Sequence, residues 1–175
     1  MEYSVKGLRV LVTAGAAGIG LEIARRFLED GARVHVCDID PAALERLARG
    51  LPGVGRTRAD VASVADVERL FADAGRSLGG LDVLVNNAGI AGPTARVEDI
   101  HPEDWDRCIA VDLNGMFYCT RKAMPLLKAA GGGSIINLSS IAGRLAFPLR
   151  SPYAAAKWAV VGFTQSLAAE AGPHG

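Results

Sequence analysis

Short apolar segments alternate along this chain with longer segments of helical periodicity. The apolar runs cover residues 8–13, 33–38, 55–59, 81–86 and 134–139, and several are rich in valine or isoleucine, which is typical of strands buried in a parallel sheet. Between them apolar residues recur every three or four positions, as at Ile19, Ile23 and Phe27. This alternation predicts βαβ units with right-handed crossovers. The expected fold is α/β, a doubly wound parallel sheet in a three-layer α/β/α arrangement.

Two long helices are expected in the second half of the chain. Residues 102–130 predict one helix, with Pro125 as the candidate point of interruption. The last helix should span residues 152–171, because Ser151 is a favourable N-cap, Pro152 suits the first helical position and Gly172-Pro173 follows. The chain contains no repeat, low-complexity tract or flexible linker, so residues 1–175 are expected to form a single domain.

Composition narrows the classes of partner and compartment. The 19 basic and 19 acidic residues give a formal net charge of zero, which argues against nucleic acid or an anionic membrane as a partner. Cys37, Cys108 and Cys119 lie among apolar residues without CxxC spacing, as expected for reduced, buried thiols. The three histidines lack metal-ligand spacing. The sequence shows no signal peptide and no run of membrane-spanning length, so we expect a cytoplasmic protein without a metal site.

A run of small residues follows the first expected strand and opens a helix. This run, residues 13–20 (TAGAAGIG), would let the backbone approach a pyrophosphate at a helix N-terminus, although a tight strand-to-helix turn explains it equally well. Asp38 ends the second expected strand at the distance where a carboxylate binds the adenosine ribose hydroxyls. Neither Ala17 nor Ile39 offers a cation for a 2′-phosphate. The spacing and the lack of a cation therefore favour NAD over NADP. The neighbouring Asp40 is expected to be a solvated carboxylate in the turn after the strand.

Tyr153 and Lys157 lie four residues apart in the last expected helix. Their side chains should therefore project from one face, about one turn apart. A nearby ammonium favours the phenolate form of a tyrosine, so the pair could transfer protons. A solvated lysine beside a packed tyrosine is the common alternative, and the pair alone does not decide between them.

Five motifs in order make the chain resemble the short-chain dehydrogenase/reductase family, a Rossmann-like fold, over its whole length. They are the glycine-rich turn, Asp60 after the third strand, Asn86-Asn87-Ala88-Gly89 after the fourth, the segment with Ser140 after the fifth, and Tyr153 with Lys157. Asp60 as a helix N-cap and the NNAG run as a plain turn are the alternatives for single motifs. Their joint occurrence favours the family reading.

The resemblance implies specific roles. It makes Tyr153 the catalytic acid/base, and Lys157 would lower the pKa of this tyrosine and hold the nicotinamide ribose. Ser140, rather than Ser139, would orient the substrate oxygen. Asn114 would help to hold a water that connects to Lys157. The implied cofactor-binding residues are Gly15, Gly18, Ile19, Gly20, Asp38, Asp60, Val61, Asn87, Ala88, Gly89, Tyr153 and Lys157. The implied function is an NAD(H)-dependent oxidoreductase that interconverts a secondary alcohol and its ketone.

One position departs from the family pattern. Glycine usually follows the threonine of the turn, whereas this chain has Ala14, and we expect its methyl group to alter how closely the cofactor phosphates approach the turn.

Between Ser140 and Tyr153, the distinctive residues are Arg144, Phe147 and Arg150. Arg150 could bind a substrate carboxylate through two hydrogen bonds, which would indicate a hydroxy acid or keto acid. Solvated arginines on a loop are the alternative.

The family usually continues beyond the last expected helix, so by resemblance the last strands of the sheet are lacking and the chain is expected to be incomplete. The alternative function is thus a nucleotide-binding fragment or regulatory module without turnover. Apolar residues on more than one side of the two long helices, including Met116, Phe117, Trp158 and Phe163, favour a homodimer or homotetramer. Packing within one chain would also use these side chains.

Overall fold

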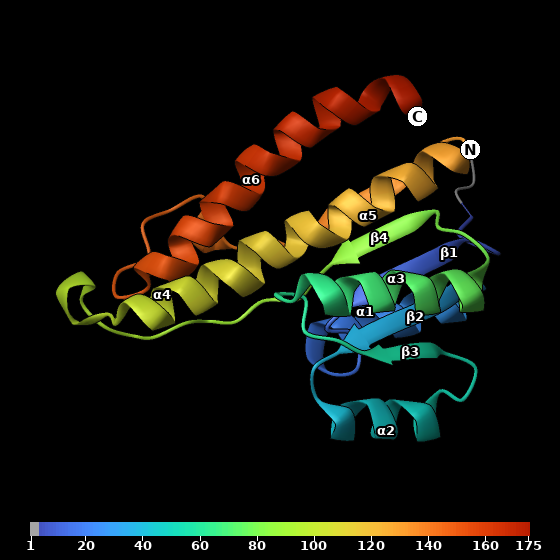
Figure 1. The fold of residues 1–175 in the computed structure, drawn as a ribbon, viewed down its shortest axis with the longest axis horizontal. Coiled ribbons are helices and arrows are strands. Elements are labelled where there is room, and N and C mark those ends of the chain that lie inside the picture. The colour runs from blue at the N-terminus through green and yellow to red at the C-terminus, as the bar shows by residue number, and fades with distance from the viewer. Residues whose placement is uncertain (1–3) are drawn as a thin grey trace.

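The computed structural model describes residues 4–175 and contains one sheet of five parallel strands in the order β3-β2-β1-β4-β5 (Figure 1). The expected doubly wound parallel sheet is confirmed, and each expected strand is present within a few residues of its predicted limits. The strands are β1 (Arg9–Thr13), β2 (Arg33–Asp38), β3 (Gly55–Arg58), β4 (Val83–Asn86) and β5 (Ser134–Asn137).

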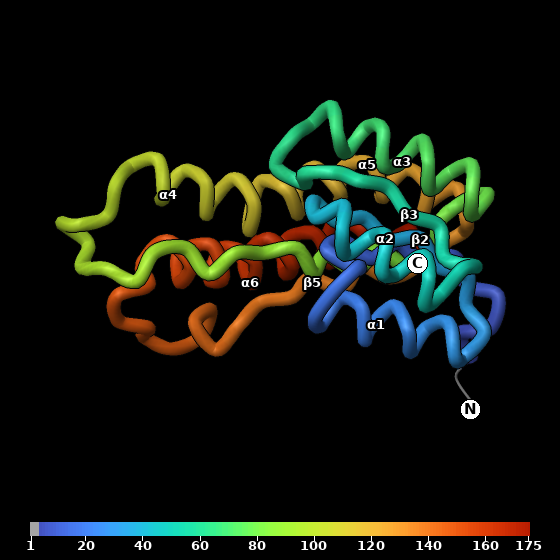
Figure 2. The backbone as a smooth tube through the Cα atoms, turned by 90° about the horizontal axis from the view of Figure 1, so that it is seen from below, coloured from blue at the N-terminus to red at the C-terminus, as the bar shows by residue number. Residues whose placement is uncertain are grey.

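Helices cover both faces of the sheet, which gives the expected three layers. Figure 2 shows α1 on one side and α3 with α5 on the other. Buried apolar residues form one cluster between the sheet and the helices α1 and α2, and a second between the sheet and α3 with α5. The α-helices are α1 (Gly18–Glu29), α2 (Pro41–Gly50), α3 (Val64–Leu78), α4 (Pro102–Ile109), α5 (Gly115–Ala129) and α6 (Ser151–Ala171).

The expected helix over residues 102–130 is interrupted at a different place from the predicted one. Pro125 lies inside α5, which continues to Ala129. The irregularity is a π-helical segment, Ala110–Asn114, that joins α4 to α5, so the two helices form one long column beside α6 (Figure 1). A π turn inserts an extra residue and rotates the side chains that follow it. This π-helical segment carries Asp112 and places its carboxylate 3.4 Å from Lys157 of α6.

The start of α6 also differs in detail from the prediction. Arg150, not Ser151, occupies the N-cap position, and no side chain bonds to the first turn. Ser151 is the first helical residue and its hydroxyl is buried without a hydrogen-bond partner. Pro152 needs no amide donor in the first turn, so it still favours the helix start at this point.

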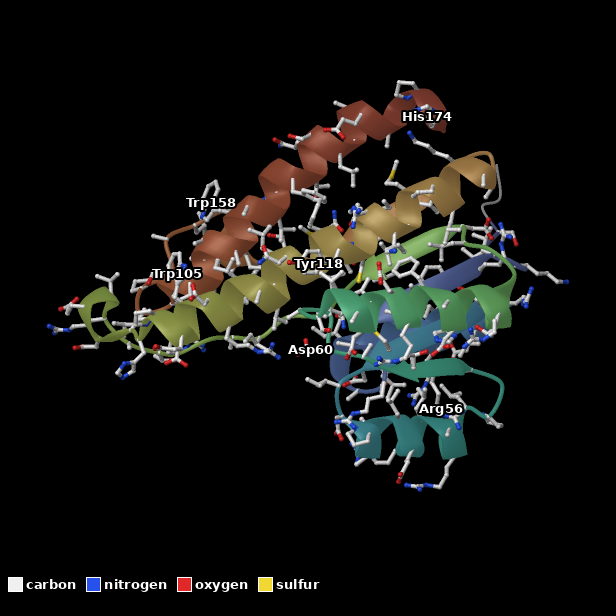
Figure 3. The ribbon with its side chains drawn as sticks, viewed as in Figure 1. Arg56, Asp60, Trp105, Tyr118, Trp158 and His174 are labelled. Carbon is white, nitrogen blue, oxygen red and sulfur yellow. The ribbon has the colours of Figure 1, made fainter. Side chains whose placement is uncertain are left out.

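The three cysteines are free and buried, as the sequence predicted. Of the apolar residues on the long helices, Met116 is buried and Phe163 packs edge-on against Phe117 at 6.4 Å. Phe117 and Trp158 remain 45% and 51% exposed. Figure 3 shows Trp158 on the outer side of α6. Packing within the chain thus uses only part of this apolar set.

His35 on β2 is buried in a hydrogen-bonded chain, so it has a packing role. Its Nδ1 lies 2.7 Å from Ser77 Oγ and its Nε2 lies 2.9 Å from Thr57 Oγ1, which donates to Asp73 at 2.8 Å. Because Thr57 gives its proton to the Asp73 carboxylate, its oxygen accepts a hydrogen bond from Nε2 of the imidazole. Burial lowers the pKa of His35 from 6.5 to about 4.

We expect this histidine to make the fold sensitive to acid. The unfolded chain binds a proton at His35 below about pH 6.5, whereas the folded protein does so only near pH 4. Its contribution to the free energy of unfolding should therefore fall as the pH decreases through this window, by about 3 kcal/mol in all. Urea unfolding of the wild type and His35→Gln at several pH values measures the difference in slope.

The exposed His101 offers a matched control for this experiment. His101→Gln should keep the wild-type dependence of stability on pH, and His35→Gln should flatten it. Equal slopes for all three proteins would contradict the assignment of the acid sensitivity to His35.

Candidate active site

The residues that the sequence singled out gather at the carboxyl ends of the strands. The strand order reverses between β1 and β4, since the chain runs outward from β1 to β3 and then from β4 to β5. In open α/β sheets, ligands bind outside the carboxyl ends at such a switch point. The glycine-rich turn follows β1 and the NNAG turn follows β4, so both lie at this crevice.

The glycine-rich turn packs closely against its neighbours. Ala14 adopts a positive φ of 48°, a conformation that glycine takes without strain. A Cβ on Gly15 would lie 2.8 Å from Val36 of β2, and one on Gly20 would lie 2.2 Å from the carbonyl oxygen of Ala14. Ala14 thus fits the turn in a left-handed conformation, while Gly15 and Gly20 must lack side chains.

Gly18 and Ile19 lie on the open side of this turn. A Cβ on Gly18, whose φ is positive at 55°, would meet nothing within 4 Å. Ile19, which the resemblance implies as a cofactor-binding residue, has a side chain that is 70% exposed. The first turn of the helix is therefore accessible from the crevice.

The NNAG turn supports the glycine-rich turn through Asn87. Its side-chain amide donates to the carbonyl oxygens of Thr13 and Ala14, both at 3.0 Å. The backbone amides of Asn87 and Ala88 both donate to Thr13 Oγ1 at 3.0 Å. Thr13 was not singled out from the sequence; it joins the two turns across the switch point.

Asp38 ends β2 beside the glycine-rich turn. Its carboxylate accepts hydrogen bonds from the backbone amides of Ala16 at 3.2 Å and Asp40 at 3.1 Å. The side chain is half-buried and held in place. Asp40 instead caps α2, where its carboxylate accepts a hydrogen bond from the amide of Ala42 at 2.8 Å. The two carboxylates therefore have different hydrogen-bond partners.

A small cavity of about 100 Å³ lies next to Asp38. Five of the implied cofactor-binding residues line it, namely Asp38, Asp60, Val61, Ala88 and Gly89. It also includes Arg107 of α4, which no sequence pattern indicated because its partner Asp60 lies far away in the sequence. These residues can accept a planar group beside the Asp38 carboxylate, which fits the adenosine half of a dinucleotide.

Asp60 lies where β3 leads into α3 (Figure 3). It is not the N-cap of α3; that position belongs to Ser63, whose hydroxyl accepts from the amide of Asp66. Asp60 accepts from the Ala62 amide at 2.9 Å and pairs with Arg107 at 3.0 Å. The ion pair connects α4 to the turn after β3, at the mouth of the cavity.

Tyr153 and Lys157 lie on the first turns of α6 with their side chains together. Lys157 Nζ is 5.5 Å from the centroid of the Tyr153 ring, and it donates to the carbonyl oxygen of Leu138 at 3.1 Å. Lys157 is buried and Tyr153 is half-buried. The ammonium therefore lies over the ring of Tyr153 and is shielded from bulk water, where its charge acts strongly.

The segment after β5 fixes α6 at this point. Ser139 Oγ donates to the carbonyl oxygen of Lys157 at 2.8 Å, and a Cβ on Gly143 would lie 2.5 Å from the same oxygen. Ser140 accepts from the amide of Ala142 at 3.2 Å and is half-buried. Ser139 thus serves the backbone, which leaves Ser140 as the hydroxyl free to donate.

The side chain next to Lys157 is Asp112 rather than Asn114. Asp112 Oδ2 lies 3.4 Å from Lys157 Nζ, and Oδ1 accepts from the amide of Ile90 at 2.7 Å. Burial raises the pKa of the Asp112 carboxyl, although the Ile90 amide and the Lys157 ammonium lower it. The sequence signal was a single carboxylate inside the apolar run IAVDL, and sequence reasoning missed it.

Arg150 lies at the edge of this site. Its Nη1 donates to the carbonyl oxygens of Ala91 at 2.8 Å and Gly92 at 3.1 Å. These bonds tie the loop after the NNAG turn to the start of α6. Arg144 and Phe147 are exposed on the intervening loop.

A larger cavity of about 320 Å³ lies between α5, β5 and α6, and none of the sequence-predicted site residues lines it.

Across residues 4–175, no cluster of three or more His, Cys, Asp or Glu side chains is arranged to hold a metal ion. The described helices include none with the length and apolarity needed to cross a membrane.

Comparison with known proteins shows the family of the chain. Residues 9–175 match the family model described as short chain dehydrogenase. A D-beta-hydroxybutyrate dehydrogenase of Cupriavidus necator is 39% identical, over 98% of this chain and 67% of its own length. A 2-dehydro-3-deoxy-L-rhamnonate dehydrogenase (NAD(+)) of a Sphingomonas strain is 36% identical, over 94% of this chain and 66% of its own length.

The fold comparison gives the same result. A solved structure assigned as a short-chain alcohol dehydrogenase of Sinorhizobium meliloti superposes with a TM-score of 0.91 at 32% identity, covering 98% of this chain and 69% of that one. The chain belongs to the short-chain dehydrogenase family, as its motifs predicted. It spans about two thirds of the length of these relatives.

Proposed function

We propose that this protein is an NAD(H)-dependent oxidoreductase that interconverts a secondary alcohol and its ketone. The observation that carries the proposal is the buried Lys157 ammonium 5.5 Å from the Tyr153 ring, on a helix that starts beside the crevice. When bound, the cofactor supplies or accepts the hydride. Tyr153 then gives a proton to the carbonyl oxygen, or takes one from the alcohol.

The other residues hold the reactants. Ser140 donates its hydroxyl hydrogen to the substrate oxygen and orients it toward Tyr153. Lys157 stabilises the phenolate and holds the nicotinamide ribose. Asn114 ends the π-helical segment, and we propose that it helps to hold a water connected to Lys157. The remaining contacts to the cofactor phosphates come from Gly15, Gly18, Ile19 and Gly20.

The preference for NAD follows from charge. The carboxylate of Asp38, held by the amides of Ala16 and Asp40, accepts hydrogen bonds from ribose hydroxyls and repels a 2′-phosphate. Ala17 and Ile39 offer no cation to neutralise such a phosphate. The Sphingomonas relative, whose name states NAD(+), supports the same cofactor.

We propose an anionic hydroxy acid or keto acid as the substrate. The names of the Cupriavidus and Sphingomonas relatives both specify carboxylate compounds. Arg150 lies in the loop that borders the proposed pocket, and the hydrogen bonds of its guanidinium to backbone carbonyls use Nη1. The rest of its guanidinium can bind a carboxylate oxygen.

A nucleotide-binding module without turnover is the second candidate function, because the chain spans about two thirds of the length of its relatives.

For either function we propose a cytoplasmic homodimer or homotetramer. The buried, unpaired cysteines suit a reducing compartment. The exposed Phe117 and Trp158 on the long helices suit a subunit contact.

One assay separates the candidates. NADH absorbance is followed with a panel of alcohols and keto acids that includes each acid and its methyl ester, and NAD binding is measured by calorimetry. Turnover that favours the acid over its ester supports both the reaction and the role of Arg150. Equal efficiency removes the arginine role, and NAD binding without turnover on any substrate supports the second candidate.

A further inference from the structure

Asp112 is a charged residue that the proposed mechanism does not yet use. It lies in the π-helical segment between α4 and α5 and is buried. Oδ1 accepts a hydrogen bond from Ile90, whereas Oδ2 is buried with no hydrogen-bond partner. A buried carboxylate is costly unless a charge of opposite sign is paired with it. Its charged neighbour therefore decides what this carboxylate can do.

The neighbour is Lys157. Its Nζ lies 3.4 Å from Asp112 Oδ2 and faces the Tyr153 ring at 5.5 Å. A Cβ on Gly89 would lie 3.2 Å from both Asp112 Oδ2 and Lys157 Nζ, so the NNAG turn encloses the pair from a third side. The ammonium is thus held between a carboxylate and the proposed catalytic phenol.

The charges around this pair can be named. Arg150 at the start of α6 and Cys108 on α4 also face it, and burial raises the pKa of the Cys108 thiol to about 11, so the thiol is neutral. Asp112 is therefore the carboxylate that opposes the Lys157 ammonium. Because Asp112 and Lys157 are both buried, a carboxylate beside the ammonium offsets part of its attraction for a phenolate.

We propose that Asp112 is a positioning residue that anchors the Lys157 ammonium and weakens its field at Tyr153, and so sets the pH range in which the phenol exchanges its proton. The proposal rests on the roles of Tyr153 and Lys157 given above. Without the carboxylate, the same ammonium stabilises the phenolate more strongly. The phenol should then ionise at lower pH.

The test uses Asp112→Asn, which keeps an oxygen to accept from Ile90 and removes the charge. Phenolate absorbance is titrated for each protein and its Tyr153→Phe counterpart, and the difference isolates this tyrosine without any need for turnover. We expect the midpoint to move to lower pH by about one unit. The acidic limb of kcat for alcohol oxidation should move by the same amount.

Two further variants make the result decisive. Asp112→Ser removes the charge in a different shape and should shift the midpoint in the same direction, even if the asparagine variant folds poorly. Asp106→Asn removes an exposed carboxylate from α4 and should leave the midpoint unchanged. An unchanged or higher midpoint in the two Asp112 variants overturns the proposal. Lack of turnover in the wild type contradicts only the proposed function, since the absorbance titration still decides the role of Asp112.

Discussion

Replacement of Tyr153 by phenylalanine is expected to reduce kcat by about 1,000-fold or more, because general acid–base catalysis contributes about 10²–10⁴-fold. The ring would still fill its place beside Lys157, 5.5 Å from the ammonium. The Kd for NAD should therefore change by no more than about threefold, since only one hydroxyl is lost. Steady-state kinetics and calorimetry measure the two quantities separately.

Tyr118 provides the control for this substitution. It lies on α5, where its ring contacts Phe117 at 5.7 Å, and it makes no contact with the proposed site among the interactions of the described residues. Tyr118→Phe should keep wild-type kcat. Retention of more than about a tenth of the activity by Tyr153→Phe would contradict its role as acid/base.

Replacement of Asp38 by asparagine is expected to change the cofactor preference. The neutral side chain loses charge-assisted hydrogen bonds to the ribose, worth about 1.5–3 kcal/mol each, so kcat/KM with NAD should fall about 100-fold. The repulsion against a 2′-phosphate disappears at the same time, so kcat/KM with NADP should rise. The ratio of the two values, measured with one substrate, is the readout.

Asp40, two residues away, is a closely matched control. Its carboxylate caps α2 and pairs with Arg46 at 3.6 Å, so Asp40→Asn should cost about 1 kcal/mol of stability at most and leave the cofactor ratio unchanged. If both variants shift the ratio equally, the change reflects net charge near the crevice. In that case the specific contact proposed for Asp38 is wrong.

Much of the fold could be predicted because its signals are local. The valine-rich runs and the helical stripes between them define the alternation, and alternation with short connections permits few topologies. The spacing from the glycine-rich turn to Asp38 and from Tyr153 to Lys157 is likewise fixed by the elements that carry them. The structure and the comparisons confirm the fold and the family, and the roles of individual site residues stay predictions.

The errors lie where distant segments meet. Ser151 was a favourable N-cap by type, yet α6 begins one residue earlier than predicted, with Arg150 at the N-cap position. Ile19 shares the helical spacing of Ile23 and Phe27 but is 70% exposed, a difference that the spacing alone does not reveal. Periodicity describes a helix and not the extent of the surface that it covers.

The sequence by itself determined the α/β alternation, the glycine turn at the end of β1 and the helical spacing of Tyr153 and Lys157, because each depends on residues close together in the chain. Only the tertiary structure decided that Asp112, and not Asn114, lies beside Lys157, and that Arg107 pairs with Asp60. Both contacts join residues more than 40 positions apart. They depend on a π turn and on the packing of α4, α5 and α6, which no local pattern encodes.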